Sequence, residues 1–243
     1  KATRNAAGGN TGIQFVLAQY NPAGELMDEP GINRVTVEEV TEGTPPDKYH
    51  RFLSQNNAIW PHEKYLNIWL MSETKYPKFW NSITKLCVPK YRLGSETLPG
   101  LSLPPVPSTW VPKVEQIGIL FRMSTFQYFQ RSIDATAERE LVTCIGNYLG
   151  LLDTWKINNS NVNDQCNDTF AYGIVNNNGS LGTNSSWSKE VGSYRFLSEN
   201  IMDDPTGTHR SVSKDQALRM YWVLKNCAGR SMWQSDFALT GKE

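Results

Sequence analysis

The chain has 243 residues, which fits one large domain or two lobes and is long enough to bury a sizeable core. Its 24 lysine and arginine residues equal its 24 aspartate and glutamate residues, so no net charge points to nucleic acid or an anionic membrane as a partner. Eight tryptophans indicate a folded body, and no apolar run approaches the length of a membrane span.

The N-terminal part of the chain predicts a leader, a strand and a short helix. Residues 1–12 are small and polar, so we expect a disordered leader followed by a single domain over residues 13–243. Ile13 to Ala18 (IQFVLA) is rich in β-forming apolar residues and predicts a strand that ends at the turn residues Asn21 to Gly24. A short helix is expected within residues 47–60, centred on 48–53.

Two further strands are predicted on either side of a proline-rich stretch. Tyr65 to Met71 (YLNIWLM) is apolar on both faces and predicts a buried strand. Val114 to Phe121 (VEQIGILF) predicts another core strand. Residues 85–111 between them contain LPGLSLPPVP and show no regular hydrophobic pattern, which indicates either a rigid surface loop or a segment beside a cleft.

The most informative stretch is Glu138 to Trp155, ERELVTCIGNYLGLLDTW. Its apolar residues have the spacing of one buried helix face: Leu141, Val142, Ile145, Tyr148 and Leu149. Gly150 permits a sharp turn after the helix, because only glycine adopts a positive φ at little cost. A leucine pair then carries the chain away.

A polar, asparagine-rich stretch over residues 156–189 follows the helix. It holds four N-x-S/T sequons, at Asn158, Asn167, Asn178 and Asn184, which in this composition indicate an exposed loop more than glycosylation. The chain has four cysteines without C-x-x-C spacing, and their even number permits disulfides. Cys144, on the predicted helix, is expected to pack as a small apolar residue.

The C-terminal part contains the segment SENIMDDPTG, Ser198 to Gly207, and a predicted closing helix. Ser213 to Gln216 has the pattern of a capping box and precedes ALRMYWVLKN, whose apolar residues fall on one face.

Several of these segments are similar to the pappalysin-like branch of the metzincin metallopeptidases. The segment TCIGNYLGLLDTW, Thr143 to Trp155, resembles that family's HEVGHYLGLLHTW and keeps its glycine at position 150. The YLNIW strand, the NIMD turn with Met202 and the closing helix flank it in the family's order. The resemblance covers about residues 13–229. It implies an α+β, metzincin-like zincin fold with an upper lobe of mixed sheet and active-site-type helix (residues 13–149) and a smaller, loop-rich lower lobe (150–243).

The resemblance also implies that the family's reactive groups are replaced. Thr143, Asn147 and Asp153 stand where the three zinc-binding histidines are expected, and Cys144 stands where the general-base glutamate is expected. A neutral hydroxyl and a neutral amide are poor zinc ligands, so we expect no zinc and no catalytic residue among them. Asp204 stands where the family has a tyrosine that stabilises the oxyanion.

Calcium is a second metal that the resemblance suggests. The segment DQCNDTFAY resembles a cysteine-containing loop of the family and offers oxygen donors at Asp164, Asn167, Asp168 and Thr169. Phe170 stands where proline is expected, and the sequence lacks EF-hand spacing. An ordinary asparagine- and aspartate-rich loop is the preferred interpretation, and a weak calcium site is the alternative.

Three functional hypotheses follow. The preferred one is a catalytically inactive homologue of a secreted zinc metallopeptidase that binds a polypeptide or another extracellular ligand along an edge strand. The second is an active peptidase with a rebuilt site that recruits Asp153, Asp203, Asp204 or Cys144. A cysteine nucleophile needs a base, and the resemblance supports none of the three histidines, His50, His62 and His209, in that place, although His209 lies shortly after the turn. The third is a structural surface module. The family resemblance implies a secreted or cell-surface location, and it leaves the oligomeric state open.

Overall fold

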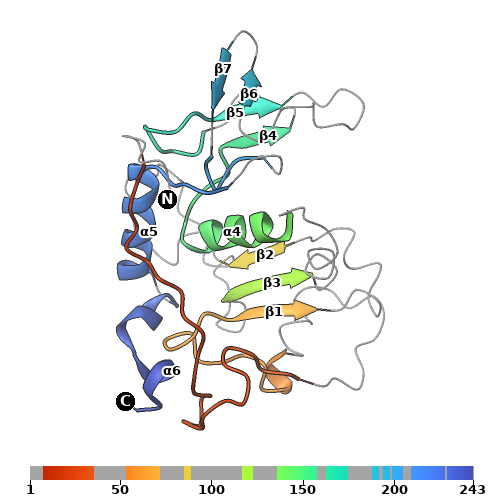
Figure 1. The fold of residues 1–243 in the computed structure, drawn as a ribbon, viewed down its shortest axis with the longest axis vertical. Coiled ribbons are helices and arrows are strands. Elements are labelled where there is room, and N and C mark those ends of the chain that lie inside the picture. Colours follow the sequence, from red (N-terminus) through yellow and green to blue (C-terminus); the bar gives the residue numbers. More distant parts are fainter. Residues whose placement is uncertain are drawn as a thin grey trace, which may run out of the picture.

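The computed structural model describes residues 8–35, 53–71, 85–88, 117–122, 136–157, 163–174, 188–191, 194–197, 199–204, 209–227 and 229–242. Within these ranges the chain is of the α+β class (Figure 1). No helix in the described part combines the length and the apolar composition that crossing a bilayer requires.

A three-stranded mixed sheet forms one side of the molecule. Its strands are β1 (Ile68–Met71), β2 (Lys85–Val88) and β3 (Gly118–Arg122), in the order β1-β3-β2. The outer strand β1 runs parallel to the central β3, whereas β2 runs antiparallel to it. Helix α4 (Thr136–Tyr148) packs against β2 and β3. The sheet and α4 are the elements that position the candidate site.

The remaining elements are small sheets and C-terminal helices. Two-stranded sheets form from β4 (Trp155–Ile157) with β5 (Tyr172–Ile174) and from β6 (Ser188–Val191) with β7 (Tyr194–Leu197). In Figure 1 these small sheets lie on one side of α4 and the three-stranded sheet on the other. The chain continues through α5 (Lys214–Asn226), the short 3₁₀ helix η4 (Ser231–Gln234) and α6 (Phe237–Thr240).

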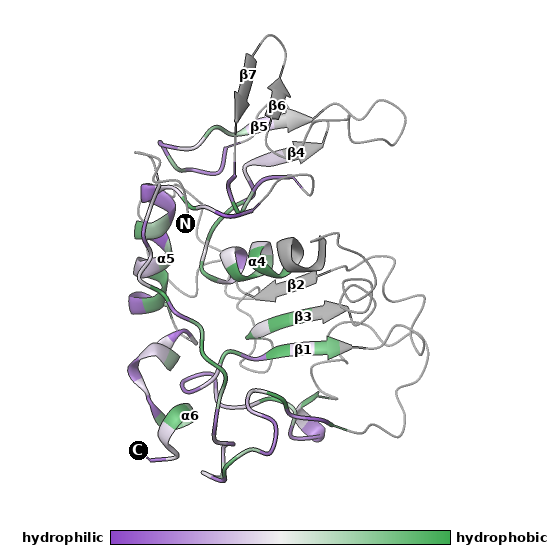
Figure 2. Cartoon of the chain, viewed as in Figure 1, coloured by the Kyte–Doolittle hydropathy of each residue, from purple (hydrophilic) through white to green (hydrophobic). Residues whose placement is uncertain are grey.

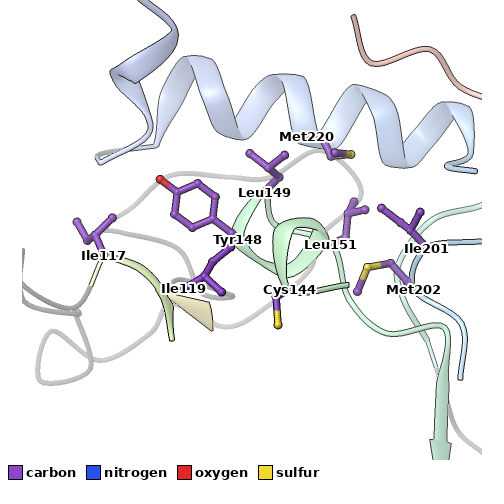
Figure 3. Close-up of a cluster of buried hydrophobic side chains, with 9 residues drawn as sticks. All are labelled: Ile117, Ile119, Cys144, Tyr148, Leu149, Leu151, Ile201, Met202 and Met220. Atoms are coloured by element: carbon purple, nitrogen blue, oxygen red, sulfur yellow. The ribbon is translucent and has the colours of Figure 1, made fainter. Parts of the chain in front are cut away.

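The core joins β3, α4, the turn at residues 199–204 and α5 (Figure 3). Its buried members are Ile117, Ile119, Cys144, Tyr148, Leu149, Leu151, Ile201, Met202 and Met220. In Figure 2 the described parts of β1 and β3 are hydrophobic, which fits their place at this core. Cys144 is fully buried in the cluster, as expected for a cysteine that packs as a small apolar residue.

The helix and the glycine turn predicted from the sequence are both present. Helix α4 ends at Tyr148, and Gly150 follows with a φ of 86°. The N–H of Leu151 donates to the carbonyl of Gly146 at 2.9 Å, which closes the last turn of the helix. The boundary that we predict between the two lobes falls at this turn.

The capping box of α5 is confirmed. The Ser213 hydroxyl accepts a hydrogen bond from the Gln216 N–H at 3.2 Å, and the Gln216 side chain accepts one from the Ser213 N–H at 2.9 Å. Because the motif is local in sequence, the residues alone determine where this helix begins.

The predicted strand over Ile13 to Ala18 does not form, so this prediction is wrong. The segment belongs to none of the described sheets, and Phe15 and Leu17 are 54% and 65% exposed. The chain that follows contacts the C-terminal helix α6, since the N–H of Gln19 donates to the carbonyl of Ala238 in that helix. A strand needs a partner as well as β-forming residues, and α6 provides none.

The prediction that YLNIWLM is buried on both faces is also wrong. Its strand begins only at Ile68, and Ile68 and Leu70 are 38% and 41% exposed, whereas Trp69 between them is buried. Strand residues alternate between faces, and an outer strand has less cover than a central one. In the central strand β3, the neighbouring residues Ile119 and Leu120 are both buried, so both faces of this strand are covered there.

Other expectations are met only in part. Residues 8–12 of the expected leader are held against α5, where the Gly9 N–H donates to the Val212 carbonyl. Strand β2 forms at residues 85–88, the start of the proline-rich stretch over residues 85–111 for which no regular structure was expected. Helical structure appears at residues 53–55, while 36–52 and 89–116 lie outside the described residues. Asn167 is exposed, and the other three sequon asparagines lie outside the described part.

Candidate functional site

The candidate site begins with two polar residues one turn apart on α4. Thr143 and Asn147 are 4% and 5% exposed. The Thr143 hydroxyl donates to the carbonyl of Ile201 at 2.8 Å. The Asn147 amide donates to the carbonyl of Leu151 at 3.1 Å and contacts the Asp153 carboxylate at 3.4 Å. The structure therefore brings Asn147 and Asp153 together and joins Thr143 to the turn at residues 199–204.

Met202 packs directly beneath α4. Its side chain is fully buried, and a Cβ atom added at Gly146 would come within 2.5 Å of its sulfur. The N–H of Thr154 donates to the Met202 carbonyl at 3.1 Å, and the Thr154 hydroxyl oxygen lies 3.1 Å from the same carbonyl. The side chain of Asn200 accepts the Met202 N–H at 2.9 Å. The turn is thus tied to the chain segment that leaves α4, with the methionine against the helix.

Two buried carboxyl groups follow Met202. Asp203 and Asp204 are each 2% exposed. Asp203 accepts the Thr154 hydroxyl at 2.8 Å, and Asp204 accepts the Tyr172 hydroxyl at 2.7 Å. Burial, together with the two carboxylates, holds the pKa of Tyr172 well above its usual range, so this hydroxyl stays a hydrogen-bond donor. Asp204 stands where the sequence resemblance predicts an oxyanion-stabilising tyrosine. It therefore offers a hydrogen-bond acceptor there, and this acceptor is already bound to the Tyr172 hydroxyl of β5.

His209 completes the site, and no role could be assigned to it from the sequence. Its imidazole is buried, with Nδ1 3.3 Å from the Thr143 hydroxyl and Nε2 2.9 Å from the Asp204 carbonyl oxygen. The backbone of His209 has a φ of 50°, in the left-handed region that residues with a Cβ atom rarely adopt. The only signal in the sequence was its place shortly after the turn.

The donor set of this site does not fit zinc. Thr143 and Asn147 offer a neutral hydroxyl and a neutral amide, which donate hydrogen bonds to backbone carbonyls. Zinc sites use imidazole, thiolate and carboxylate ligands, three of them in a catalytic site. Across the described residues no group of three histidine, cysteine, aspartate or glutamate side chains is arranged to hold a metal ion.

The loop at residues 163–170 is held by protein contacts. Asp164 accepts the Thr169 hydroxyl at 2.6 Å through one carboxylate oxygen and the Cys166 N–H at 3.4 Å through the other. The buried guanidinium of Arg219, from α5, donates to the carbonyls of Asp164 and Gln165. A positive side chain therefore binds the carbonyl oxygens of this loop.

The same loop docks on the N-terminus of α5. The Asp168 carboxylate accepts the Asp215 N–H at 3.0 Å, and the Asp215 carboxylate accepts the Asn167 N–H at 3.0 Å. Burial raises the pKa of the Cys166 thiol to about 12, and the nearby Arg219 opposes this shift. Two of the four predicted calcium donors, Asp164 and Asp168, thus have carboxylate oxygens engaged within the protein.

Comparison with known proteins identifies the type of fold. No protein-family model matches the chain, and no curated protein matches it in sequence. Mirolysin in complex with compound 9 is similar in structure, with a TM-score of 0.63 at 17% identity. Mature mirolysin from Tannerella forsythia in complex with a cleaved peptide gives a TM-score of 0.60 at 17% identity. Each comparison covers 98% of this chain and 80% of the mirolysin chain. Mirolysin is a metzincin-type zinc metallopeptidase, and at this identity the likeness shows the fold alone: the chain has an α+β, metzincin-like fold.

Proposed function

We propose that this protein is a catalytically inactive homologue of the pappalysin-like zinc metallopeptidases and that it binds an extended polypeptide outside the cytoplasm. The observation that carries the proposal is the engagement of Thr143. At the position of the first zinc ligand there is a hydroxyl, and it donates to the Ile201 carbonyl at 2.8 Å.

The chemistry of hydrolysis supports inactivity. This class of peptidase needs a metal ion to acidify a water molecule and a carboxylate to accept its proton. At the position of the base, Cys144 lies fully buried in the core. At the positions that the resemblance assigns to the zinc ligands and the general base, the chain therefore lacks the groups that hydrolysis requires.

Polypeptide binding is supported by the arrangement of the sheet. Strand β2 is antiparallel, lies beside α4, and pairs on one side only among the described strands. An extended peptide can add to such an edge through main-chain hydrogen bonds. One of the mirolysin structures contains a cleaved peptide, which supports a polypeptide as the class of ligand. A secreted or cell-surface location follows from the family resemblance.

The proposal includes no metal cofactor. For zinc, the reason is the donor chemistry at Thr143 and Asn147. For calcium, the reason is that Asp164 and Asp168 already accept hydrogen bonds and Arg219 already binds the loop's carbonyls. We therefore propose that the loop at residues 163–170 folds without calcium.

One observation favours the alternative of an active peptidase with a rebuilt site. The Thr143 hydroxyl and the His209 imidazole lie 3.3 Å apart, which is the pairing of a nucleophile with a base. The stronger contact of this hydroxyl is with the Ile201 carbonyl, and both side chains are buried. The hydroxyl is thus held as a structural donor, and inactivity remains the preferred proposal.

Hydrogen exchange in the presence of a mixed peptide library tests the binding proposal. Peptides should slow amide exchange in β2 and leave β1, the other outer strand, unchanged. The same samples, analysed for cleavage products with zinc, calcium or chelator, should show hydrolysis no faster than background. Unchanged exchange in β2 would contradict polypeptide binding there. Cleavage that disappears with Asp153→Ala, Cys144→Ala or Thr143→Val would support the rebuilt site instead.

A further inference from the structure

Helix α5 presents apolar side chains on the face opposite its buried side. Leu218 and Tyr221 are 66% and 49% exposed. Exposed lysines stand before and after them, at Lys214 and Lys225. These four residues are spaced by four, three and four positions, so they form one line along the helix, which we call the α5 stripe. The outer face of a surface helix is usually polar, so the leucine and tyrosine at its centre indicate a contact surface.

The charge of the α5 stripe is positive. The Lys225 ammonium lies 4.4 Å from the centre of the Tyr221 ring, and neither Lys225 nor Lys214 forms an ion pair with a described carboxylate. The acidic residue of this helix, Asp215, accepts the Asn167 N–H of the loop at residues 163–170. A partner of the stripe therefore needs apolar side chains with negative charge beside them.

Pairing of the α5 stripe with the same stripe of a second copy is unfavourable. In an antiparallel pair Lys214 would lie opposite Lys225, and in a parallel pair each lysine would lie opposite its own counterpart. Both arrangements bring like charges together, which opposes association. The partner surface must therefore differ from the stripe.

The N-terminal part of the chain has a surface of the required kind. Residues 17–32 fold back on themselves, with the Gly31 N–H donating to the Ala18 carbonyl at 2.7 Å, and we call them the N-terminal hairpin. Because Gly31 has no side chain, Leu17 lies against its backbone, where a Cβ atom would come within 2.8 Å of the Leu17 side chain. The hairpin exposes large apolar side chains at Leu17, Leu26 and Ile32.

The charge of the N-terminal hairpin is negative. Residues 17–32 contain Glu25, Asp28 and Glu29 and neither lysine nor arginine. Glu29 forms an ion pair at 2.7 Å with Arg34, beyond the hairpin. Glu25 and Asp28 form no ion pair with a described basic side chain. The hairpin therefore offers two carboxylates, beside exposed apolar side chains, to the two lysines of the α5 stripe.

We propose that the α5 stripe of one chain binds the N-terminal hairpin of a second copy of the chain. In Figure 1, α5 lies along one edge of the molecule and the hairpin lies at the end that carries the C-terminus, so the two surfaces of one chain do not meet. Each chain then uses different surfaces on two neighbours, and successive contacts build an open row or a closed ring. This proposal is independent of peptidase inactivity and of polypeptide binding at β2.

Sedimentation of the natural protein over a concentration series tests the association itself. We expect the mean mass to rise above that of one chain as the concentration approaches about 0.1 mM, the range of weak protein contacts. Raising the salt from about 0.05 M to about 0.5 M should increase the dissociation constant about tenfold, because salt screens exposed charges. A mass that stays at one chain throughout the series would overturn the proposal.

A mixture of two variants tests which surfaces meet. Tyr221→Glu disables the α5 stripe and Asp28→Lys disables the N-terminal hairpin, and both positions are exposed, so the fold should be kept. Each variant alone should sediment as one chain at a concentration where the natural protein associates. An equimolar mixture should form a dimer and nothing larger, because one intact stripe and one intact hairpin remain.

Two results of the mixing experiment would overturn the proposal. Dimers of Asp28→Lys alone would show that α5 pairs with itself, and a mixture that stays at one chain would show that the stripe and the hairpin do not bind each other. The matched controls are Tyr221→Phe, which keeps the ring, and Asp28→Glu, which keeps the charge. Both should associate within about twofold of the natural protein, and a loss in either would contradict a contact made by that ring and that carboxylate.

Discussion

The sulfur of Met202 lies so close to Gly146 that a Cβ atom at position 146 would come within 2.5 Å of it. The absence of a side chain at Gly146 therefore allows the turn at residues 199–204 to approach α4. Because Met202 is fully buried, it has little room to move aside.

We predict that Gly146→Ala and Met202→Ala are coupled. The alanine at 146 overpacks the contact at a cost of about 1–3 kcal/mol, partly offset by about 1 kcal/mol of helix preference. Met202→Ala leaves a cavity and costs about 2–5 kcal/mol. In the double variant the cavity accepts the new methyl group, so the loss of unfolding free energy in urea should be smaller than the sum of the single losses. Simple additivity would show that the two residues are not in contact.

A second prediction concerns Gly150. Gly150→Ala should lower the unfolding free energy by about 2–4 kcal/mol, because the φ of 86° is unfavourable for alanine and the new Cβ atom would lie 2.6 Å from Val223. Gly12 provides a matched control, since its φ is 62° and a Cβ atom there meets nothing within 4 Å. Gly12→Ala should cost only the backbone part, about 1 kcal/mol. Equal losses in thermal or urea unfolding would contradict the packing of α5 on this turn.

A third prediction concerns Arg219. Arg219→Met removes the donors to the carbonyls of Asp164 and Gln165, so we expect a loss of about 2–3 kcal/mol and faster hydrogen exchange over residues 163–170. Arg210→Met, at an exposed arginine, should change stability by less than about 0.5 kcal/mol. Calcium should stabilise neither the natural protein nor the variant. A rise in unfolding temperature with calcium would show that the loop binds the ion.

The fourth prediction is a loss of stability at alkaline pH. Burial raises the pKa of the Cys166 thiol to about 12, whereas the thiol of an unfolded chain ionises near pH 8.5. The folded state keeps the proton across this window while the unfolded state loses it, so the unfolding free energy falls as pH rises from about 8.5 towards 12. Burial also raises the pKa of Tyr148 to about 12, which extends the fall above pH 10 or so.

Urea unfolding at pH 8 and pH 10 measures this effect. Cys166→Ala should reduce the difference in unfolding free energy between the two pH values. Cys227→Ala, at a half-buried cysteine beyond α5, is the comparison variant and should leave the difference unchanged. If Cys166→Ala does not flatten the pH dependence, the buried thiol is not its source.

The parts of the fold that the sequence predicted are those that short-range rules determine. Helix α4 follows from apolar spacing, its turn from Gly150, and the start of α5 from the Ser213 capping box. The strand at residues 13–18 fails because pairing depends on distant segments. Strand β2 was missed for the same reason, since its only described partner is β3, about thirty residues away in sequence.

The candidate site shows the same limit. The resemblance to a known motif drew attention to Thr143, Asn147 and Met202, and the structure places all three around α4 and the turn that packs on it. The sequence could not assign His209, because its contact with Thr143 joins residues 66 positions apart. It could not show that Tyr172 binds Asp204 either. These partners depend on how the turn and β5 pack in three dimensions.

The most direct test of the central proposal is the zinc content of protein purified without chelator, measured by elemental analysis. We expect no stoichiometric zinc, because Thr143 and Asn147 offer a neutral hydroxyl and a neutral amide, which are poor zinc ligands. A zinc ion in each chain, located by its anomalous signal beside Thr143, Asn147 and Asp153, would contradict the account.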